Sequence, residues 1–459
     1  MNCNTQNAKI KSITEKTLIV GIDVGSETHY ARAFDWRNIE FSKKPFAFSN
    51  DEAGFTSFKA WMEDIKEKSG KTVVIPGMEP TGHYWLNLGA FLQDNGMKPV
   101  HVNPHHVHKS KELDDNNPSK DDRKDPKTIA ALVNEGRFNY PYIPTGVYAE
   151  IRSLYGLQVM TQEALIRVKN RIARWLSIYF PEYKDVYRNR DAISGVMVLK
   201  VCPLPADIVK LGAEGVNKIW RDAKLRAAGM KRATALVEAA RHSVGSIESP
   251  EAARYEMELL LGDYEVYTKR MEELTEKIEA KIEEIPYVDK LLEIKGVGKK
   301  IVSGLIAEIG DISRFDNPKQ VQKLAGYAIV ACSSGKHKGE SHISYRGRKR
   351  LRYVLYEAAI SLIGQNAEFK EIHRYYLTRQ NNPLKKMESV IAVACKALRV
   401  FYAILTKGVS YDGKYMLESI RHPEKQVLVN SIAAVRTIAS SRFQFEIPFN
   451  IVSSSDALI

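Results

Sequence analysis

The chain has 459 residues, a length that suits about three domains. Hydrophobic residues make up 44% of it and charged residues 27%, so it can bury several cores and is not wholly disordered. With 68 Lys and Arg against 55 Asp and Glu, its formal net charge of +13 favours a polyanionic partner such as nucleic acid.

The sequence argues against membrane-spanning and disulfide-rich proteins. Its most apolar stretch, 390–405, contains Lys396 and Arg399, and the N-terminus lacks the apolar core of a signal peptide. Its 4 cysteines are too scattered for a disulfide framework or a zinc finger. We therefore expect a protein of a reducing compartment, which indicates the cytoplasm.

Short apolar runs alternate with helical segments in the first third of the chain. The runs at 18–22, 72–78 and 99–102 have the length and composition of buried strands. Their alternation with helical periodicity predicts an α/β sheet domain over 17–140, after a loose tail at 1–16.

Helical periodicity dominates after residue 140. We expect a helical linker over 141–286, in which apolar residues between 260 and 282 recur at spacings of four and three, as in a coiled-coil seam. The same pattern is typical of a helix that packs on its own domain, so both arrangements stay open. A mainly helical second domain over 287–410 and a weakly patterned tail over 411–459 follow.

Carboxylates lie at the ends of two predicted strands and at the start of one predicted helix. Asp23 ends the first strand, Glu79 follows the second, and Asp122 and Asp125 share one face of a helix start. Ligands of open α/β sheets bind beyond the carboxyl ends of the strands, so these acids can converge.

Converged carboxylates repel one another unless a cation lies between them, and hard oxygen ligands select Mg²⁺ or Mn²⁺. Two such ions can hold the attacking and the leaving oxygen of a phosphodiester. The pattern therefore predicts metal-assisted phosphoryl transfer on nucleic acid. Acids at these positions can equally form turns or cap a helix, and that alternative stays open.

A glycine turn in the second domain is typical of a helix-hairpin-helix. Gly296 and Gly298 would free backbone N–H groups for a phosphate, and Lys299 adds positive charge at the next helix start. An ordinary packing turn between two helices would have the same pattern.

A basic segment over 333–352 holds seven Lys or Arg and one acid, a net charge of +6 in twenty residues. Such a concentration of charge indicates phosphate contacts whose strength falls steeply with salt. Ser333 and Ser334 begin it, in a predicted loop, and a serine there can attack a phosphate or merely bond to it. The predicted phosphate contacts are Lys336, Lys338, Arg346, Arg348, Lys349, Arg350 and Arg352.

The motifs around these residues resemble those of the insertion-sequence transposases with a DEDD active site. This is family one hundred and ten among insertion sequences, which also includes the Piv-type DNA invertases. The N-terminal motifs are Gly21-Ile22-Asp23, Glu79-Pro80-Thr81-Gly82 and 120–125; the C-terminal ones are 295–298, 307–311, Ala325-Gly326, Ser334-Gly335 and 343–352.

The resemblance implies a fold and a chemistry. It implies an α/β RuvC-like, ribonuclease-H-type N-terminal domain, a helical coiled-coil region and a mainly α C-terminal transposase domain. It assigns Asp23, Glu79, Asp122 and Asp125 as ligands of two Mg²⁺ ions, with Mn²⁺ as a substitute. It assigns Ser334 as a nucleophile that becomes linked to DNA, although Ser333 beside it leaves room for a shift of one residue.

The resemblance also implies partners and a location. These are donor and target DNA, a noncoding bridge RNA that pairs with both, and further copies of the chain, as a dimer or as a tetramer in synapsis. It places the protein at the nucleoid of a bacterium or archaeon.

Three other functions stay open from the residues. A RuvC-like junction-resolving nuclease would use the four acids with a metal-activated water and need no serine. A non-catalytic DNA-binding scaffold would need no metal. The segment 21–26 is also similar to the phosphate loop of sugar kinases and actin-like ATPases, although the surplus of positive charge argues against nucleotide binding.

Overall fold

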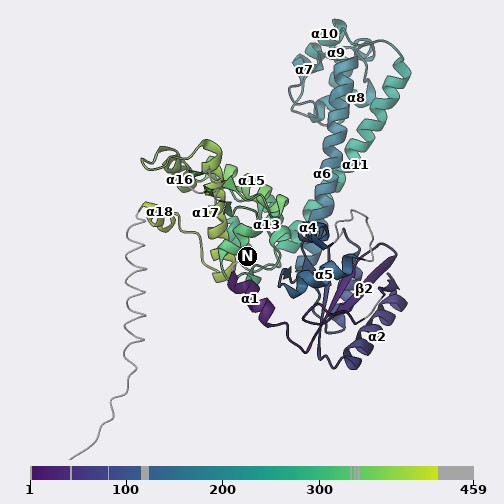
Figure 1. Cartoon of the computed structure of the whole chain (residues 1–459). Helices are drawn as coiled ribbons and strands as arrows, with labels where there is room; N and C mark the ends of the chain where they lie inside the picture. Colours follow the sequence, from purple (N-terminus) through teal and green to yellow (C-terminus); the bar gives the residue numbers. More distant parts are fainter. Residues whose placement is uncertain are drawn as a thin grey trace, which may run out of the picture. The chain divides into compact units, whose positions relative to one another are not determined.

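The computed structural model describes residues 3–41, 44–80, 82–114, 124–330, 333–334, 337–338 and 342–421. Its contacts divide the chain into two units, Met1–Ile143 and Pro144–Ile459 (Figure 1).

The first unit is built on a six-stranded mixed sheet. Its order is β3-β2-β1-β4-β5-β6, in which β1 pairs in parallel with β4 and β4 with β5, while the other pairs are antiparallel. The predicted α/β character of this region is confirmed. The strands are β1 (Thr17–Asp23), β2 (Thr28–Phe34), β3 (Phe46–Ser49), β4 (Val73–Met78), β5 (Val100–Val102) and β6 (Phe138–Asn139).

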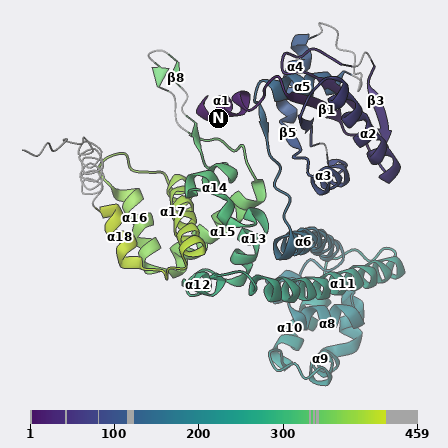
Figure 2. The same ribbon diagram turned by 90° about the horizontal axis from the view of Figure 1, so that it is seen from below.

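Helices cover both faces of this sheet (Figure 2). Because side chains alternate along a strand, Leu18, Val20 and Ile22 of β1 face α2 (Glu52–Lys68) and α3 (Trp85–Asp94). Ile19 points to the opposite face and packs with Ile129 and Val133 of α5 (Asp125–Asn134). This burial on both faces explains why β1 is a nearly continuous apolar run.

The N-terminal residues differ from the prediction of a loose tail over 1–16. These residues contain a helix, α1 (Cys3–Lys11). Elsewhere in the first unit, a further helix, α4 (Pro104–Asp114), follows β5. The Gln6 amide donates to the Glu135 carbonyl at 2.9 Å, and the Lys9 ammonium donates to the Phe138 carbonyl. These contacts tie α1 to the end of α5 and to β6, which a pattern of local polarity cannot reveal.

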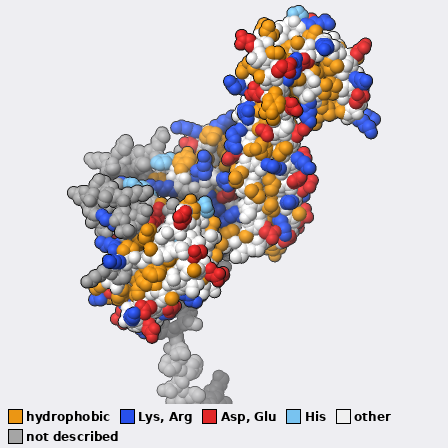
Figure 3. Space-filling view, turned by 90° about the vertical axis from the view of Figure 1, so that its right-hand side faces the viewer, with side chains coloured by type: hydrophobic (Ala, Val, Ile, Leu, Met, Phe, Trp, Pro, Cys, Tyr) orange, Lys and Arg blue, Asp and Glu red, His pale blue; other side chains and the backbone are white. Residues whose placement is uncertain are grey.

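The second unit begins with two long antiparallel helices, α6 (Gly146–Tyr179) and α11 (Pro250–Ile282). Four helices between them form a compact head with its own core, in which the Trp175 indole donates to the Ala253 carbonyl at 3.0 Å. The face of the head seen in Figure 3 carries Lys and Arg mixed with Asp and Glu. The head helices are α7 (Tyr183–Val186), α8 (Ile193–Val201), α9 (Pro205–Asp222) and α10 (Met230–Arg241).

The predicted seam of α11 packs against α6 of the same chain. Leu260, Ile278 and Ile282 are buried, whereas Met271 and Leu274 in its middle are half-buried. The buried ends of the seam therefore pack within the chain, which was one of the two arrangements left open by the sequence. A coiled coil between two copies stays a prediction.

The rest of the second unit is mainly helical, as predicted. Its core surrounds α17, in which Val393, Ala397 and Phe401 are fully or almost fully buried. This helix is long and apolar enough to cross a membrane, but half of the segment with that composition is buried inside the unit. The elements are α12 (Val288–Leu292), α13 (Lys299–Ile309), η1 (Ile312–Arg314), α14 (Pro318–Leu324), β7 (Ile329–Val330), β8 (Ser333–Ser334), β9 (His337–Lys338), β10 (His342–Ile343), α15 (Lys349–Gln365), α16 (Ala367–Thr378), α17 (Lys386–Lys407) and α18 (Gly413–Arg421).

Candidate active site

Two of the predicted acids lie at neighbouring strand ends. Ile22 of β1 is the register partner of Met78 of β4, and Asp23 and Glu79 are the next residues of the two parallel chains. Both side chains are half-buried. Since residues two apart share a face, both acids extend the face of the sheet that α5 covers.

Two glycines allow α5 to lie directly on the strands that carry these acids. A Cβ at Gly21 would stand 1.8 Å from the carbonyl oxygen of Pro126, and one at Gly77 would stand 2.6 Å from a methyl group of Val133. Gly21 and Gly77 are register partners, so together they form a strip without side chains. The helix start at Asp125, one residue before Pro126, is thereby held beside the end of β1.

The fourth acid, Asp122, lies outside the described residues, as do Asp121 and Arg123. Within the described ranges, no group of three or more His, Cys, Asp or Glu side chains stands close enough to hold a metal ion. The donor set of Asp23, Glu79 and Asp125 is nevertheless all carboxylate, the kind that Mg²⁺ and Mn²⁺ prefer, and the glycine strip brings their backbones to one edge.

The turn after Asp23 is fixed by a histidine that sequence reasoning missed. His29 is fully buried, and its Nδ1 accepts a hydrogen bond from the Gly25 N–H at 3.2 Å. The Asn50 amide donates to the Ser26 carbonyl at 3.0 Å in the same turn. Burial lowers the pKa of His29 below its ordinary value. A neutral His29 can therefore accept at Nδ1 and position the chain that leaves Asp23.

A turn lies between α12 and α13, as expected for either a helix-hairpin-helix or an ordinary packing turn. Gly296 has a φ of +98°, and a Cβ there would stand 3.1 Å from the Ser361 carbonyl oxygen of α15. Gly298 is the residue before α13 and lines a cavity of about 430 Å³ beside this turn.

The lysines of this turn have acidic partners in the structure. The Lys299 ammonium lies 3.0 Å from Glu279 and 3.4 Å from Glu283, both near the end of α11. The Lys300 ammonium lies 3.3 Å from Glu357. A phosphate that contacts Lys299 would have to compete with the carboxylates of Glu279 and Glu283, so this contact stays a prediction.

The basic segment contains arginines with two different environments. Arg348 donates to the Glu308 carbonyl at 2.8 Å, and Arg352 donates to the Ala325 carbonyl at 3.0 Å, so both hold loops and helices of the protein together. Arg346, Lys349 and Arg350 are exposed around the start of α15. Among the predicted phosphate contacts whose side chains the structure describes, these three are exposed to solvent.

The expected loop around Ser334 contains paired strands. β8 pairs with β9 in antiparallel fashion, and Ser334 is the register partner of His337. Lys338 is the last residue of β9, whereas Lys336 and Gly335 lie outside the described residues. The three described acids belong to the first unit and Ser334 belongs to the second.

Comparisons with known proteins match both parts of the chain. Residues 20–181 match a family model of DEDD transposases of IS110, described as "Transposase", and residues 288–376 match one described as "Transposase IS116/IS110/IS902 family". The first range contains all four predicted acids, and the second contains Ser334.

Individual relatives extend these matches. The chain is 24% identical over 395 residues to the "Insertion element IS116 uncharacterized 44.8 kDa protein" of Streptomyces clavuligerus, which covers 84% of this chain and 94% of that protein. It is 26% identical over 264 residues to "Putative transposase y4rJ" of Sinorhizobium fredii, with 54% and 64% covered. It is 30% identical over 124 residues to the "Pilin gene-inverting protein" of Moraxella bovis, with 27% and 38% covered.

Proposed function

We propose that this chain, which belongs to the IS116/IS110/IS902 family of transposases, cuts and rejoins DNA through a covalent phosphoserine intermediate. It would thus serve as the transposase or site-specific recombinase of an insertion sequence. The observation that carries the proposal is the sheet geometry: Asp23 ends β1, Glu79 directly follows the adjacent parallel strand β4, and α5 packs over the strip formed by Gly21 and Gly77.

The acids would bind divalent metal. We assign Asp23, Glu79, Asp122 and Asp125 as the ligands of two Mg²⁺ ions, for which Mn²⁺ can substitute. Such ions stabilise negative charge on the attacking and leaving oxygens of a phosphodiester. The family match over 20–181 and the all-carboxylate donor set support this assignment.

Ser334 would be the nucleophile. Its Oγ attacks the scissile phosphorus and loses its proton to a base, while the bond from phosphorus to the sugar oxygen breaks and that oxygen takes up a proton. A free hydroxyl of a second DNA strand then attacks the phosphoserine and releases Ser334. Because each step exchanges one phosphodiester for another, no ATP is needed. The exposed Arg346, Lys349 and Arg350 support phosphate binding nearby in the sequence.

The acids and the serine belong to different units, so the complete site would form when both bind the same DNA, within one chain or between copies. We propose that a noncoding bridge RNA guides the choice of donor and target DNA. The acting form would be a dimer that becomes a tetramer in synapsis, at the nucleoid. The net charge of +13 supports a large polyanionic partner.

The test is a search for a protein–DNA adduct that survives denaturation. Full-length protein is mixed with Mg²⁺, end-labelled donor DNA and RNA transcribed from the DNA that flanks the reading frame. We expect an adduct with the native chain and with Ser333→Ala, and none with Ser334→Ala or Asp23→Asn. Asp64→Asn is the matched control, since Asp64 lies on α2 and pairs only with Lys68 at the surface.

Two outcomes would contradict the proposal. An adduct that persists in Ser334→Ala would exclude Ser334 as the nucleophile. Cleaved DNA with free ends and no adduct would instead favour the junction-resolving nuclease, which uses the same acids with water.

A further inference from the structure

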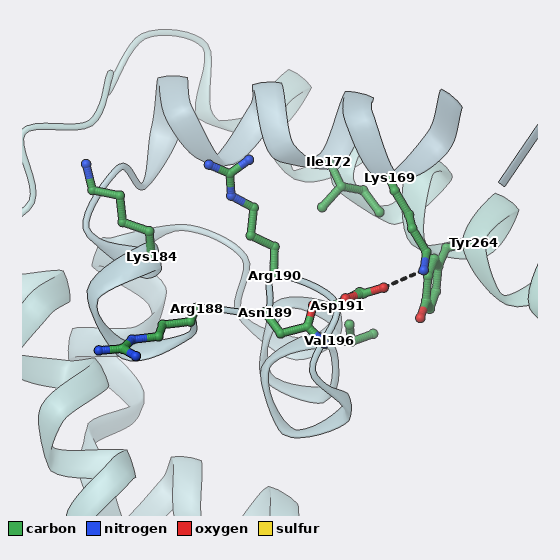
Figure 4. A pocket seen from close by; sticks show the side chains of 9 residues that line it. All are labelled: Lys169, Ile172, Lys184, Arg188, Asn189, Arg190, Asp191, Val196 and Tyr264. Carbon is green, nitrogen blue, oxygen red and sulfur yellow. Dashed lines mark ion pairs between the residues drawn. The ribbon is translucent and has the colours of Figure 1, made fainter. Parts of the chain in front are cut away.

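A cavity of about 460 Å³ lies in the helical head of the second unit (Figure 4). Its walls come from α6, from α7 and the segment that follows it, from α8, and from α11. None of its lining residues is one of the four predicted acids or lies in the basic segment over 333–352. A function at this cavity would therefore be additional to the chemistry proposed above.

The charge of the lining is strongly one-sided. Four of the nine lining residues are Lys or Arg, against the single acid Asp191. Asp191 is already paired with Lys169, at 2.5 Å. Lys184, Arg188 and Arg190 are exposed, and within the described part of the chain no ion pair neutralises them. The lining therefore keeps an excess of positive charge, although Lys184 also acts on the nearby Glu182 carboxylate.

The backbone that carries these cations is firmly anchored. Tyr183 and Tyr187 are buried at 1% and 3% exposure and stack with their ring centres 4.8 Å apart. Lys184 and Arg188 directly follow these two anchors in the sequence. The Glu182 carboxylate accepts a hydrogen bond from the Val244 N–H at 3.0 Å, which ties the segment to the loop after α10. A preorganised backbone reduces the entropy that ligand binding would cost.

The cavity has two chemically different ends. Figure 4 shows the side chains of Lys184, Arg188 and Arg190 on one side of the Lys169–Asp191 pair. The Tyr264 ring lies beside that pair, with the Lys169 ammonium 5.7 Å from its centre. Cations beside an aromatic ring are the combination that holds single-stranded nucleic acid, because phosphates contact the cations and bases contact the ring.

We propose that this head pocket binds the phosphodiester backbone of a single nucleic-acid strand. Lys184, Arg188 and Arg190 contact its phosphates, and Tyr264 offers an apolar surface to a neighbouring base. The strand is RNA or single-stranded DNA, which share this backbone chemistry.

The first test measures the salt dependence of binding to labelled single-stranded RNA, single-stranded DNA and duplex DNA. We compare the full-length chain with K184Q/R188Q/R190Q and with the control K218Q/R226Q/K231Q, which removes three exposed charges elsewhere on the head. Loss of three phosphate contacts from a single strand lowers the slope of log K against log salt by about 2. We expect a loss of affinity of at least about tenfold for one single strand and little change in the control.

A gain of affinity offers a second readout that unfolding cannot imitate. Asp191→Asn removes the only acid of the lining and releases Lys169. We expect it to tighten binding of the same strand several-fold. Circular dichroism and thermal unfolding verify that each variant keeps its fold.

The site itself is located by photo-crosslinking. A photoreactive amino acid at Val196, which lines the pocket, should capture the strand, whereas the same group at the exposed Ile247 should not. Crosslinking of RNA or of single-stranded DNA each supports the proposal and identifies the strand. Unchanged affinity and salt slope in K184Q/R188Q/R190Q, no crosslink at Val196, or binding of inorganic phosphate alone would overturn it. The Asp23→Asn background separates this result from catalysis, since head binding should persist there.

Discussion

Gly21 of β1 and Gly77 of β4 are register partners on adjacent parallel strands, and α5 lies across both. The pair removes two side chains from the sheet face where a helix backbone must come close. Asp23 and Glu79 follow these glycines at the next position on the same face. The positions of Asp23, Glu79 and the start of α5 therefore depend on two glycines that carry no chemistry themselves.

Gly21→Ala should displace α5 and weaken the first unit. Its Cβ would meet the Pro126 carbonyl oxygen at 1.8 Å, which forces backbone to move, and overpacking of this kind costs about 1–3 kcal/mol. Thermal unfolding should show a lower stability, and metal titration should show a lower affinity. Gly156→Ala in α6 is the control, because nothing lies within 4 Å of its Cβ and the helix should be stabilised by up to ~1 kcal/mol.

Metal binding should depend on the start of α5. We expect Asp125→Asn to weaken binding of Mn²⁺ at least about tenfold in calorimetric titration, because one anionic ligand is lost. Asp64→Asn on α2 makes the same chemical change away from the strand ends and should leave the titration as it is. Equal affinity in both variants would remove Asp125 from the ligand set.

The first unit should lose stability in acid because of His101 on β5. Burial lowers the pKa of His101 to about 4 from its ordinary value of 6.5, so the neutral ring is the form that the fold accommodates. The unfolded chain takes up the proton first, and stability present above pH 6.5 is lost as the pH falls toward about 4. At about 1.4 kcal/mol per pKa unit, the loss is at most on the order of 3 kcal/mol. The free energy of unfolding, measured by denaturant titration at several pH values in this range, should fall more steeply with decreasing pH for the native chain than for His101→Leu.

Arginines of the basic segment should separate into structural and DNA-binding residues. Arg352→Gln removes charged hydrogen bonds to the carbonyls of Ala325 and Tyr345, which costs about 1.5–3 kcal/mol. Arg350→Gln should leave stability unchanged and lower the salt slope of DNA binding by about 1. Gel-shift titrations at several salt concentrations, together with thermal unfolding, distinguish the two. Equal effects of both variants on stability would contradict this division.

The parts of the fold that depend on local pattern could be predicted from the sequence. The apolar run over Thr17–Asp23 is buried on both faces, and its length and composition sufficed to place Asp23 at its end. The same holds for Glu79 after β4. Motif order could add Asp125 at a helix start, but its position beside β1 arises from the Gly21–Gly77 strip, which requires the strand register.

Long-range partners explain what the sequence could not reveal. The ion pairs of Lys299 could not be foreseen from local pattern, because Glu279 and Glu283 stand sixteen to twenty residues away, at the end of another helix. His29 gave no motif, since its role comes from the Gly25 N–H across a turn. The head pocket joins Lys169, Arg188 and Tyr264 from three separate segments, and only the charge run at 184–190 could have drawn attention to it.

Mass spectrometry can identify the residue of the protein to which DNA becomes attached. Adducts formed in Mg²⁺ are digested with protease and nuclease, and the residual nucleotide is located on a peptide that spans Ser333 and Ser334. We expect a nucleotide esterified to Ser334 in the native chain and no modified peptide in Asp23→Asn. A nucleotide attached to another residue, or rejoined DNA formed without any modified peptide, would contradict this expectation.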